Sequence, residues 1–224
     1  MEEDDVRFLR DNGLTIVLVT ATLMTIAGMY IAGWLANNEE LTAHGSPALT
    51  LMQYGLSGDF LSAVFENWES EFLQMSVYVV LTAYLYQRGS AESKDPDERS
   101  PQDEGLADRE EDTEAPWPVK MGGIVRLLYA YSLGIVLTGL FLASFVLHLV
   151  SSARSESETA QLHGQATTTF VQHLGSAEFW FESLQNWQSE FLSTAVIVVL
   201  SIFLRYRGSP ESKPVGSPHR ETGS

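Results

Sequence analysis

The sequence contains no cysteine among its 224 residues, which excludes disulfides, thiolate metal sites and cysteine nucleophiles. Basic residues are scarce, with 13 Lys and Arg against 29 Asp and Glu. The resulting net charge of −16 excludes the basic face that nucleic-acid binding requires. The chain also lacks His-Glu-x-x-His, Gly-x-Ser-x-Gly and phosphate-loop patterns, so nothing in it predicts an enzyme or a cofactor.

What the chain does have is apolar residues gathered in four runs, at 14–36, 72–86, 127–150 and 191–204. A helix rises about 1.5 Å per residue, so about 20 residues cross a hydrocarbon core of about 30 Å. The first run holds 23 residues without a charge. A cleaved signal peptide is the alternative for this run, but its apolar core would be shorter. The four runs therefore predict a multi-pass membrane protein.

The chain also repeats itself at an offset of 119 residues. Without a gap, residues 39–94 and 158–213 are identical at 24 of 56 positions. Asn-Trp-x-Ser-Glu-Phe-Leu occurs at 67–73 and 186–192, and Arg-Gly-Ser-x-Glu-Ser-Lys at 88–94 and 207–213. An internal repeat of this kind predicts a duplicated module. The repeat thus predicts a first membrane module at 1–88, an acidic linker at 89–119, a second membrane module at 120–207 and a flexible tail at 208–224.

Each module predicts a helical hairpin. Ahead of its second apolar run, apolar residues recur at helical spacing from Ser57 and from Ser176, which predicts an outer amphipathic helix near the membrane surface. The fold class is thus all-α, with four transmembrane helices in two hairpins that are parallel repeats. The linker is rich in Pro, Asp, Glu and Ser and has no apolar period, which predicts disorder.

Basic residues set the orientation. Twelve of the 13 Lys and Arg lie near the N-terminus, the linker or the tail, and only Arg154 lies between paired runs. Because Lys and Arg stay on the cytoplasmic side, both termini and the linker are predicted to be cytoplasmic in a plasma-membrane protein. The lipid bilayer is then its first partner, and both His-Gly loops face outward.

Two carboxylates are the main functional candidates. Glu71 and Glu190 occupy equivalent positions, each about one helical turn inside a tryptophan, Trp68 or Trp187, and therefore at the outer edge of the hydrocarbon. Ionisable groups at that depth are costly unless they face water, a partner or the bundle interior. A pair of them near the pseudo-two-fold axis would share a proton or hold a cation, whereas the alternative is a solvated carboxylate at the interface. The polar neighbours of this candidate cation or proton site are Asn67, Asn186, Ser70 and Ser189.

The outer loops supply a second candidate. His44 and His163 each precede a glycine, and Glu39 and Glu158 lie five residues before them. Imidazole and carboxylate groups can bind a divalent metal, but this spacing matches no standard site. The alternative is a turn that each histidine holds by a hydrogen bond.

Four further residues are predicted to be anchors at the two membrane surfaces. Trp68 and Trp187 stand where an apolar run begins, as in an interfacial aromatic belt. Arg88 and Arg207 stand where a run ends, beside a glycine suited to a left-handed cap. Small residues four apart in the first and third runs favour close helix packing, between the modules or in a homo-oligomer.

With these motifs the chain resembles an uncharacterised prokaryotic family of duplicated four-span membrane proteins, a domain of unknown function. The resemblance extends from Phe8 to Pro214 and departs from the usual pattern at Ser155 and Ser157. It implies the membrane architecture and no activity. Two functional hypotheses remain, a small cation or proton transporter or channel with an external carboxylate pair, and a non-transporting scaffold or stress-related protein. In the second, the acidic linker binds a cytoplasmic partner.

Overall fold

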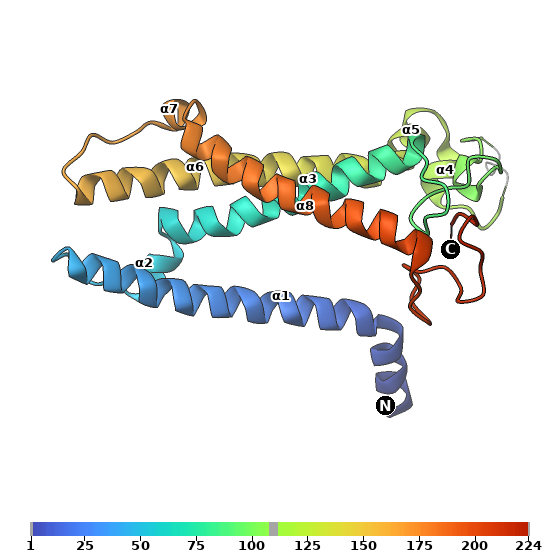
Figure 1. The fold of residues 1–224 in the computed structure, drawn as a ribbon, viewed down its shortest axis with the longest axis horizontal. Helices are drawn as coiled ribbons and strands as arrows, with labels where there is room; N and C mark the ends of the chain where they lie inside the picture. Colours follow the sequence, from blue (N-terminus) through green and yellow to red (C-terminus); the bar gives the residue numbers. More distant parts are fainter. Residues whose placement is uncertain (1, 108–111, 224) are drawn as a thin grey trace. The chain divides into compact units, whose positions relative to one another are not determined.

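The computed structural model describes residues 2–107 and 112–223, and the regular elements within them are all helical. Residues 108–111 of the predicted linker lie outside the described residues. The helices, labelled in Figure 1, are in chain order α1 Glu2–Ala43, α2 Leu51–Gly55, α3 Gly58–Tyr84, the 3-10 helix Pro101–Asp103, α4 Trp117–Met121, α5 Gly123–Ala130, α6 Ser132–Leu162, α7 Phe170–Leu174 and α8 Ala177–Phe203.

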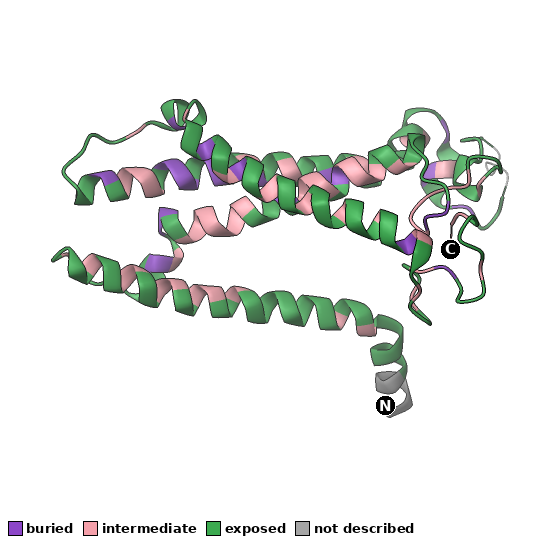
Figure 2. Cartoon of the chain, in the orientation of Figure 1, coloured by how far each residue is buried: buried purple, intermediate pink, exposed green. Residues whose placement is uncertain are grey.

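Three of these helices, α1, α6 and α8, are long and apolar enough to cross a membrane. The most apolar stretch of α1 has no buried residue, and Figure 2 shows its surface exposed along most of its length. Apolar faces of this extent are typical of helices surrounded by lipid. The second predicted run lies in α3, which carries Glu71 and Gln74 in its apolar half and ends at Tyr84, so hydropathy alone does not identify it as a span.

The helix boundaries differ from those of the apolar runs. The first run was predicted to end at 36 and the third to span 127–150, whereas α1 continues to Ala43 and α6 covers Ser132–Leu162. The added segments are polar but contain no Gly or Pro, so nothing in them breaks the helix. Both helices end where Gly45 and Gly164 adopt φ of 73° and 67°, the left-handed conformation that glycine tolerates.

The amphipathic segment expected ahead of each second run leads into that run within one continuous helix. The amphipathic segment after Ser57 is the first part of α3, and the one after Ser176 is the first part of α8. No Gly or Pro occurs between 59 and 84 or between 177 and 203, so each helix continues into the apolar run without interruption. Only the five-residue helices α2 and α7 stand apart.

The chain forms two compact units, and each takes residues from both sequence modules. Unit 1 comprises Met1–Ala63 with Val150–Gln172, and unit 2 comprises Val64–Leu149 with His173–Ser224. In unit 1, the side-chain amide of Asn38 on α1 makes two hydrogen bonds to the backbone of Leu49. It donates to the Leu49 carbonyl at 2.9 Å and accepts from the Leu49 N–H at 2.6 Å. Ser157 Oγ donates to the carbonyl of Thr168 at 2.9 Å, at the same offset of 119 residues.

The short helices of unit 1 begin in matching ways. Thr50 caps α2 through a capping box with Gln53, in which each side chain bonds the other residue's backbone N–H. Thr169 and Gln172 make the same pair of bonds at the start of α7. These matched contacts fix the turn from a long helix into the next one in both sequence copies.

Tyr54 is a buried core residue of unit 1. It is 3 % exposed, forms an aromatic cluster with Tyr30 and Phe60, and donates its hydroxyl to Asp59 at 3.2 Å. Burial, with a smaller effect of the adjacent Asp59, raises the pKa of Tyr54 to about 12. Gly58 then brings α3 against α6, where a Cβ would lie 2.8 Å from the carbonyl oxygen of Ser151.

Unit 2 is held together by α3, the first part of α6, and α8. Ser76 of α3 and Thr138 of α6 share a hydrogen bond of 2.8 Å. Phe179 of α8 is fully buried and meets the ring of Phe145 on α6 at 5.7 Å. Polar and aromatic contacts therefore both bind the three helices of this unit.

The two Arg-Gly-Ser loops of unit 2 have the same internal hydrogen bonds. Gln87 N–H donates to Ser93 Oγ at 2.9 Å, and Tyr206 N–H donates to Ser212 Oγ at 2.9 Å. Lys213 is 1 % exposed, and its ammonium donates to several backbone carbonyls, including that of Gly89 at 2.5 Å. Burial lowers the pKa of Lys213. The backbone carbonyls around its ammonium group nevertheless supply the hydrogen-bond acceptors that a buried ammonium needs.

Candidate functional site: carboxyl groups along the α3–α8 seam

A stripe of polar side chains runs along the face where α3 meets α8 in unit 2. Glu71, Gln74 and Tyr78 follow one another at spacings of three and four, so they share one face of α3. Glu190 and Thr194 are four apart and share a face of α8. We call this set the α3–α8 seam.

One end of the seam is the predicted carboxylate pair. The structure places the carboxyl groups of Glu71 and Glu190 close enough for their charges to interact. Glu71 is exposed and Glu190 is half-buried. Two carboxylates this close repel each other when both are ionised. A proton shared between them, or a cation, would relieve that repulsion.

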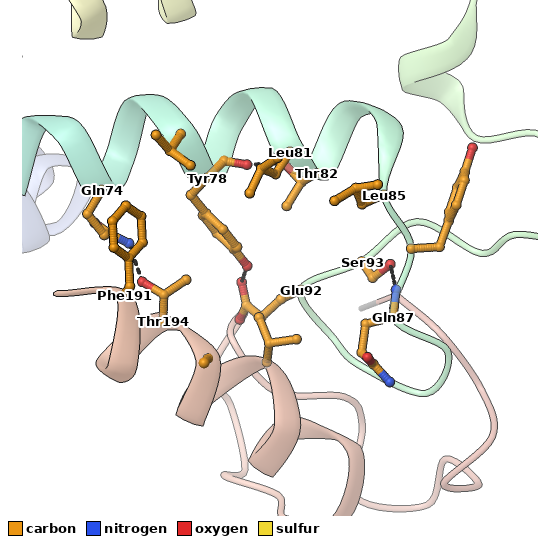
Figure 3. A pocket seen from close by; sticks show the side chains of 14 residues that line it. Gln74, Tyr78, Leu81, Thr82, Leu85, Gln87, Glu92, Ser93, Phe191 and Thr194 are labelled. Atoms are coloured by element: carbon orange, nitrogen blue, oxygen red, sulfur yellow. Dashed lines mark hydrogen bonds between the residues drawn. The ribbon is translucent and has the colours of Figure 1, made fainter. Parts of the chain in front are cut away.

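The next step along the seam is a pair of neutral side chains. Gln74 Nε2 donates to Thr194 Oγ1 at 2.5 Å, and that hydroxyl donates to the backbone carbonyl of Glu190 at 3.0 Å. Beyond them lies a pocket of about 270 Å³ between α3 and α8. Figure 3 shows Gln74 and Thr194 at one end of this pocket, and Tyr78 reaching across it to Glu92.

The far end of the seam holds a second carboxyl pair. Tyr78 donates its hydroxyl to Glu92 Oε2 at 3.1 Å, and the carboxyl group of Glu211 lies close enough to interact with that of Glu92. Burial and the neighbouring Glu211 raise the pKa of Glu92, while the bond from Tyr78 partly offsets them. Glu92 and Glu211 are 119 residues apart, as are Glu71 and Glu190. Carboxyl pairs from equivalent positions therefore stand at both ends of the seam.

Beside the seam lies a buried polar cluster. Glu69 of α3 and His148 of α6 are both 0 % exposed, and Glu69 Oε2 is 2.7 Å from His148 Nδ1. The other carboxylate oxygen of Glu69 accepts from Trp187 Nε1 of α8 at 2.8 Å. One side chain thus ties three helices together, as buried ionisable groups require when water is excluded.

The predicted neighbours of the carboxylate pair bind elsewhere. Asn186 donates its side-chain amide to Glu66 and to the backbone carbonyl of Glu182. The hydroxyls of Ser70 and Ser189 donate to the backbone carbonyls of Asn67 and Asn186, at 2.9 and 2.8 Å. These short residues satisfy their own helices, as hydroxyls within a helix commonly do.

The outer-loop candidates separate into two kinds. His44 and His163 lie together in unit 1, with ring centroids 5.2 Å apart. Glu158 instead pairs with Arg154 at 2.7 Å, and the backbone carbonyl of Glu39 accepts from Thr42 at 3.0 Å. Among the described residues, no three His, Asp or Glu side chains gather as a metal-binding group.

The predicted anchors are also not equivalent. Trp68 is 41 % exposed beside Phe65 and Phe72, whereas Trp187 is half-buried and binds Glu69. Arg88 forms an ion pair with Asp97 at 2.5 Å, and Arg207 is exposed. A residue that was not predicted, Arg205, donates to carbonyls at the end of α8, including that of Ser201 at 3.2 Å.

The model of one protein family matches residues 5–224, nearly the whole chain and all the elements just described. The chain belongs to the DUF6766 family, a domain of unknown function. No curated protein and no solved structure matches this sequence. The family assignment names no activity, so the chemistry of this DUF6766 protein has to be inferred from its own residues.

Sequence reasoning missed three parts of this DUF6766 site. Glu69 received no weight because Gln188 replaces it in the second copy, and its partner His148 lies 79 residues away. Tyr78 was not considered. Glu92 and Glu211 stood within the repeated Arg-Gly-Ser motif and were read only as part of a turn. Their retention in both copies was the signal that could have identified them.

Proposed function

We propose that this DUF6766 protein is a four-span plasma-membrane protein of two parallel hairpin modules, 1–88 and 120–207. Three helices with the length and composition of spans support this, as do hydrogen bonds that recur at an offset of 119 residues. The fourth span is α3, which is equivalent to α8 in the repeat. The distribution of Lys and Arg puts both termini and the linker in the cytoplasm.

Cysteine accessibility tests this orientation, since the chain has no thiol of its own. A cysteine replacing Ser46 should react with an impermeant reagent added to intact cells. A cysteine replacing Ser100 should react only after the cells are opened. The reverse pattern would contradict the orientation.

We further propose that the protein conducts protons along the α3–α8 seam. The observation that carries the proposal is the closeness of the carboxyl groups of Glu71 and Glu190, because a proton shared between them at the predicted outer end of the seam would relieve their mutual repulsion. Tyr78 lies seven residues further along α3, about 10 Å at the rise of a helix. Its hydroxyl leads to Glu92, where the second pair holds a proton more firmly than a lone carboxyl group would.

The side chains along this route have the chemistry that proton transfer needs. Carboxyl and hydroxyl groups both donate and accept hydrogen bonds, so each can receive a proton on one side and release one on the other. The pocket between Thr194 and Tyr78 is about 270 Å³, far larger than the roughly 10–15 Å³ that one water requires. The proposal therefore requires that water enter this pocket, whose lining is mainly apolar, and join the two hydroxyls into one path.

A proton fits this route better than a metal cation. Cations such as Ca²⁺ take six to eight oxygen ligands, whereas the middle of the seam offers one amide and two hydroxyl groups. The described residues also contain no group of three acidic or histidine side chains placed as metal ligands. Transport by proton transfer needs neither a wide pore nor a full coordination shell.

Proton flux into liposomes tests the proposal. The purified full chain would be reconstituted around a pH-sensitive dye, and a potassium gradient with valinomycin would supply the driving force. We expect flux above that of empty liposomes, and its loss in the double variant Glu71→Gln/Glu190→Gln. Glu39→Gln, which removes an exposed carboxylate outside the seam, is the matched control.

Two outcomes would contradict proton conduction. One is flux no greater than that of empty liposomes, which would favour a scaffold whose acidic linker binds a cytoplasmic partner. The other is undiminished flux in the double variant. The thermal unfolding midpoint of that variant, compared with the parent, separates loss of the pathway from loss of the fold.

A further inference from the structure

The two His-Gly loops meet in unit 1, far in the sequence from the proton pathway. His44 follows the end of α1 and His163 follows the end of α6. Their imidazole rings lie edge to face with centroids 5.2 Å apart, and both side chains are exposed. Two histidines from equivalent positions of the repeat thus stand side by side in the loops predicted to face outward.

Each ring has its tautomer fixed by the helix that carries it. His44 Nδ1 lies 2.9 Å from the backbone carbonyl of Glu40, and His163 Nδ1 lies 2.9 Å from that of Thr159. A carbonyl oxygen only accepts, so Nδ1 must carry the hydrogen in both rings. The Nε2 lone pair is then the acceptor of each neutral ring. Metal-binding histidines are commonly oriented by such a bond from the second ring nitrogen.

The spacing of the rings suits a shared metal ion. A metal–nitrogen bond of about 2.0–2.1 Å plus about 1.1 Å to the ring centre places each centroid about 3.2 Å from the metal. Two such arms at a tetrahedral angle separate the centroids by about 5.2 Å. The observed separation of 5.2 Å agrees with this value, and a shared metal ion would require the two edge-to-face rings to turn until both Nε2 atoms point at it.

The surrounding charge also favours a cation. Neither α1 nor α6 has a basic residue in its last turn, so the negative ends of both helix dipoles remain uncompensated there. The acidic side chains of Glu39 and Glu40 lie in the same last turns of α1. Imidazole ligands select Zn²⁺, Cu²⁺ or Ni²⁺ over Mg²⁺ and Ca²⁺.

We propose that His44 and His163 together bind one divalent transition-metal ion, with water completing its coordination, and so clamp the two outer loops to each other. A site of two protein ligands is weaker than a structural zinc site with four. It would therefore respond to metal supplied from outside rather than retain an ion permanently.

Calorimetric titration of the full chain in detergent, purified without a polyhistidine tag, tests this site with ZnCl₂, CuCl₂ and MgCl₂. We expect one equivalent of Zn²⁺ or Cu²⁺ to bind and Mg²⁺ not to bind. His44→Gln and His163→Gln should each weaken binding by at least about tenfold, the smallest loss that removal of even an outer-shell partner causes. His219→Gln is the matched control, because His219 is exposed and bonds a carbonyl through Nδ1 but has no second histidine beside it.

Equal binding by the parent and both single variants, or an equal loss in His219→Gln, would overturn the proposal. The variant H44C/H163C provides an independent measurement, since the parent has no cysteine. It should bind Cd²⁺ with a thiolate absorption band that neither single cysteine variant shows. Absence of that band in folded protein would also refute the site.

Discussion

The buried cluster of Glu69, His148 and Trp187 gives the sharpest stability prediction. Glu69→Ala removes the carboxylate that accepts from two side chains, at 2.7 and 2.8 Å, in a site where Glu69 and His148 are 0 % exposed. Leaving a buried donor without its acceptor typically costs about 1–3 kcal/mol, so the loss of both bonds should cost about 2–6 kcal/mol. For a chain of this size, about 2–4 °C per kcal/mol gives a fall in the unfolding midpoint of roughly 4–24 °C.

Glu69→Gln should lie between the parent and the alanine variant. Glutamine keeps one oxygen that can accept a hydrogen bond and loses the charge, so one of the two bonds survives. Thermal unfolding of detergent-solubilised protein, followed by circular dichroism, measures all three. Gln188→Ala is the matched control, because Gln188 is the exposed equivalent of Glu69 in the second copy and should leave the midpoint nearly unchanged. A midpoint for Glu69→Ala within about 2 °C of the parent would refute the buried cluster, since it corresponds to only about 1 kcal/mol.

Three further changes have defined outcomes. Gly58→Ala should destabilise the folded protein by about 1–3 kcal/mol, because the added Cβ would lie 2.8–2.9 Å from backbone atoms of α6. Chemical denaturation measures this loss, and an unchanged denaturation midpoint would contradict it. Glu92→Gln should remove a pH dependence. Because the pKa of Glu92 is raised in the folded protein, it contributes stability that is fully present below the ordinary glutamate pKa of 4.5 and is lost as the pH rises through the raised pKa. Over that pH interval the parent should therefore lose more stability than Glu92→Gln. Glu98→Gln is the control. Thr50→Ala should cost about 0.5–2 kcal/mol through loss of the capping box of α2, and equal stability would show that water replaces the cap.

Local sequence patterns located the long helices because helix formation depends on neighbouring residues. The four apolar runs lie mainly within α1, α3, α6 and α8, and the glycines of the His-Gly pairs mark where α1 and α6 end. Hydropathy placed the ends of α1 and α6 too early, since polar residues such as those at 37–43 also form helix. The helical spacing of apolar residues after Ser57 and Ser176 did indicate that helix begins well before the apolar parts of α3 and α8.

The repeat carried the part of the site that could be predicted. Glu71 and Glu190 keep their carboxylates in both copies, and that retention was enough to expect them near each other. The same reasoning would have found Glu92 and Glu211, had the motif not been read as a turn. It could not find Glu69, because the second copy has Gln188 at that position.

By itself, the sequence of this DUF6766 protein determined an all-helical chain with membrane-length helices, a duplicated pattern and the residues available for acid–base chemistry. Those features follow from composition and from contacts within a few residues. Only the tertiary structure decided that Glu69 binds His148 and Trp187, that Tyr78 reaches Glu92, and that His44 meets His163. Such pairs depend on the rotation and register of one helix against another, which side chains distant in the sequence determine jointly.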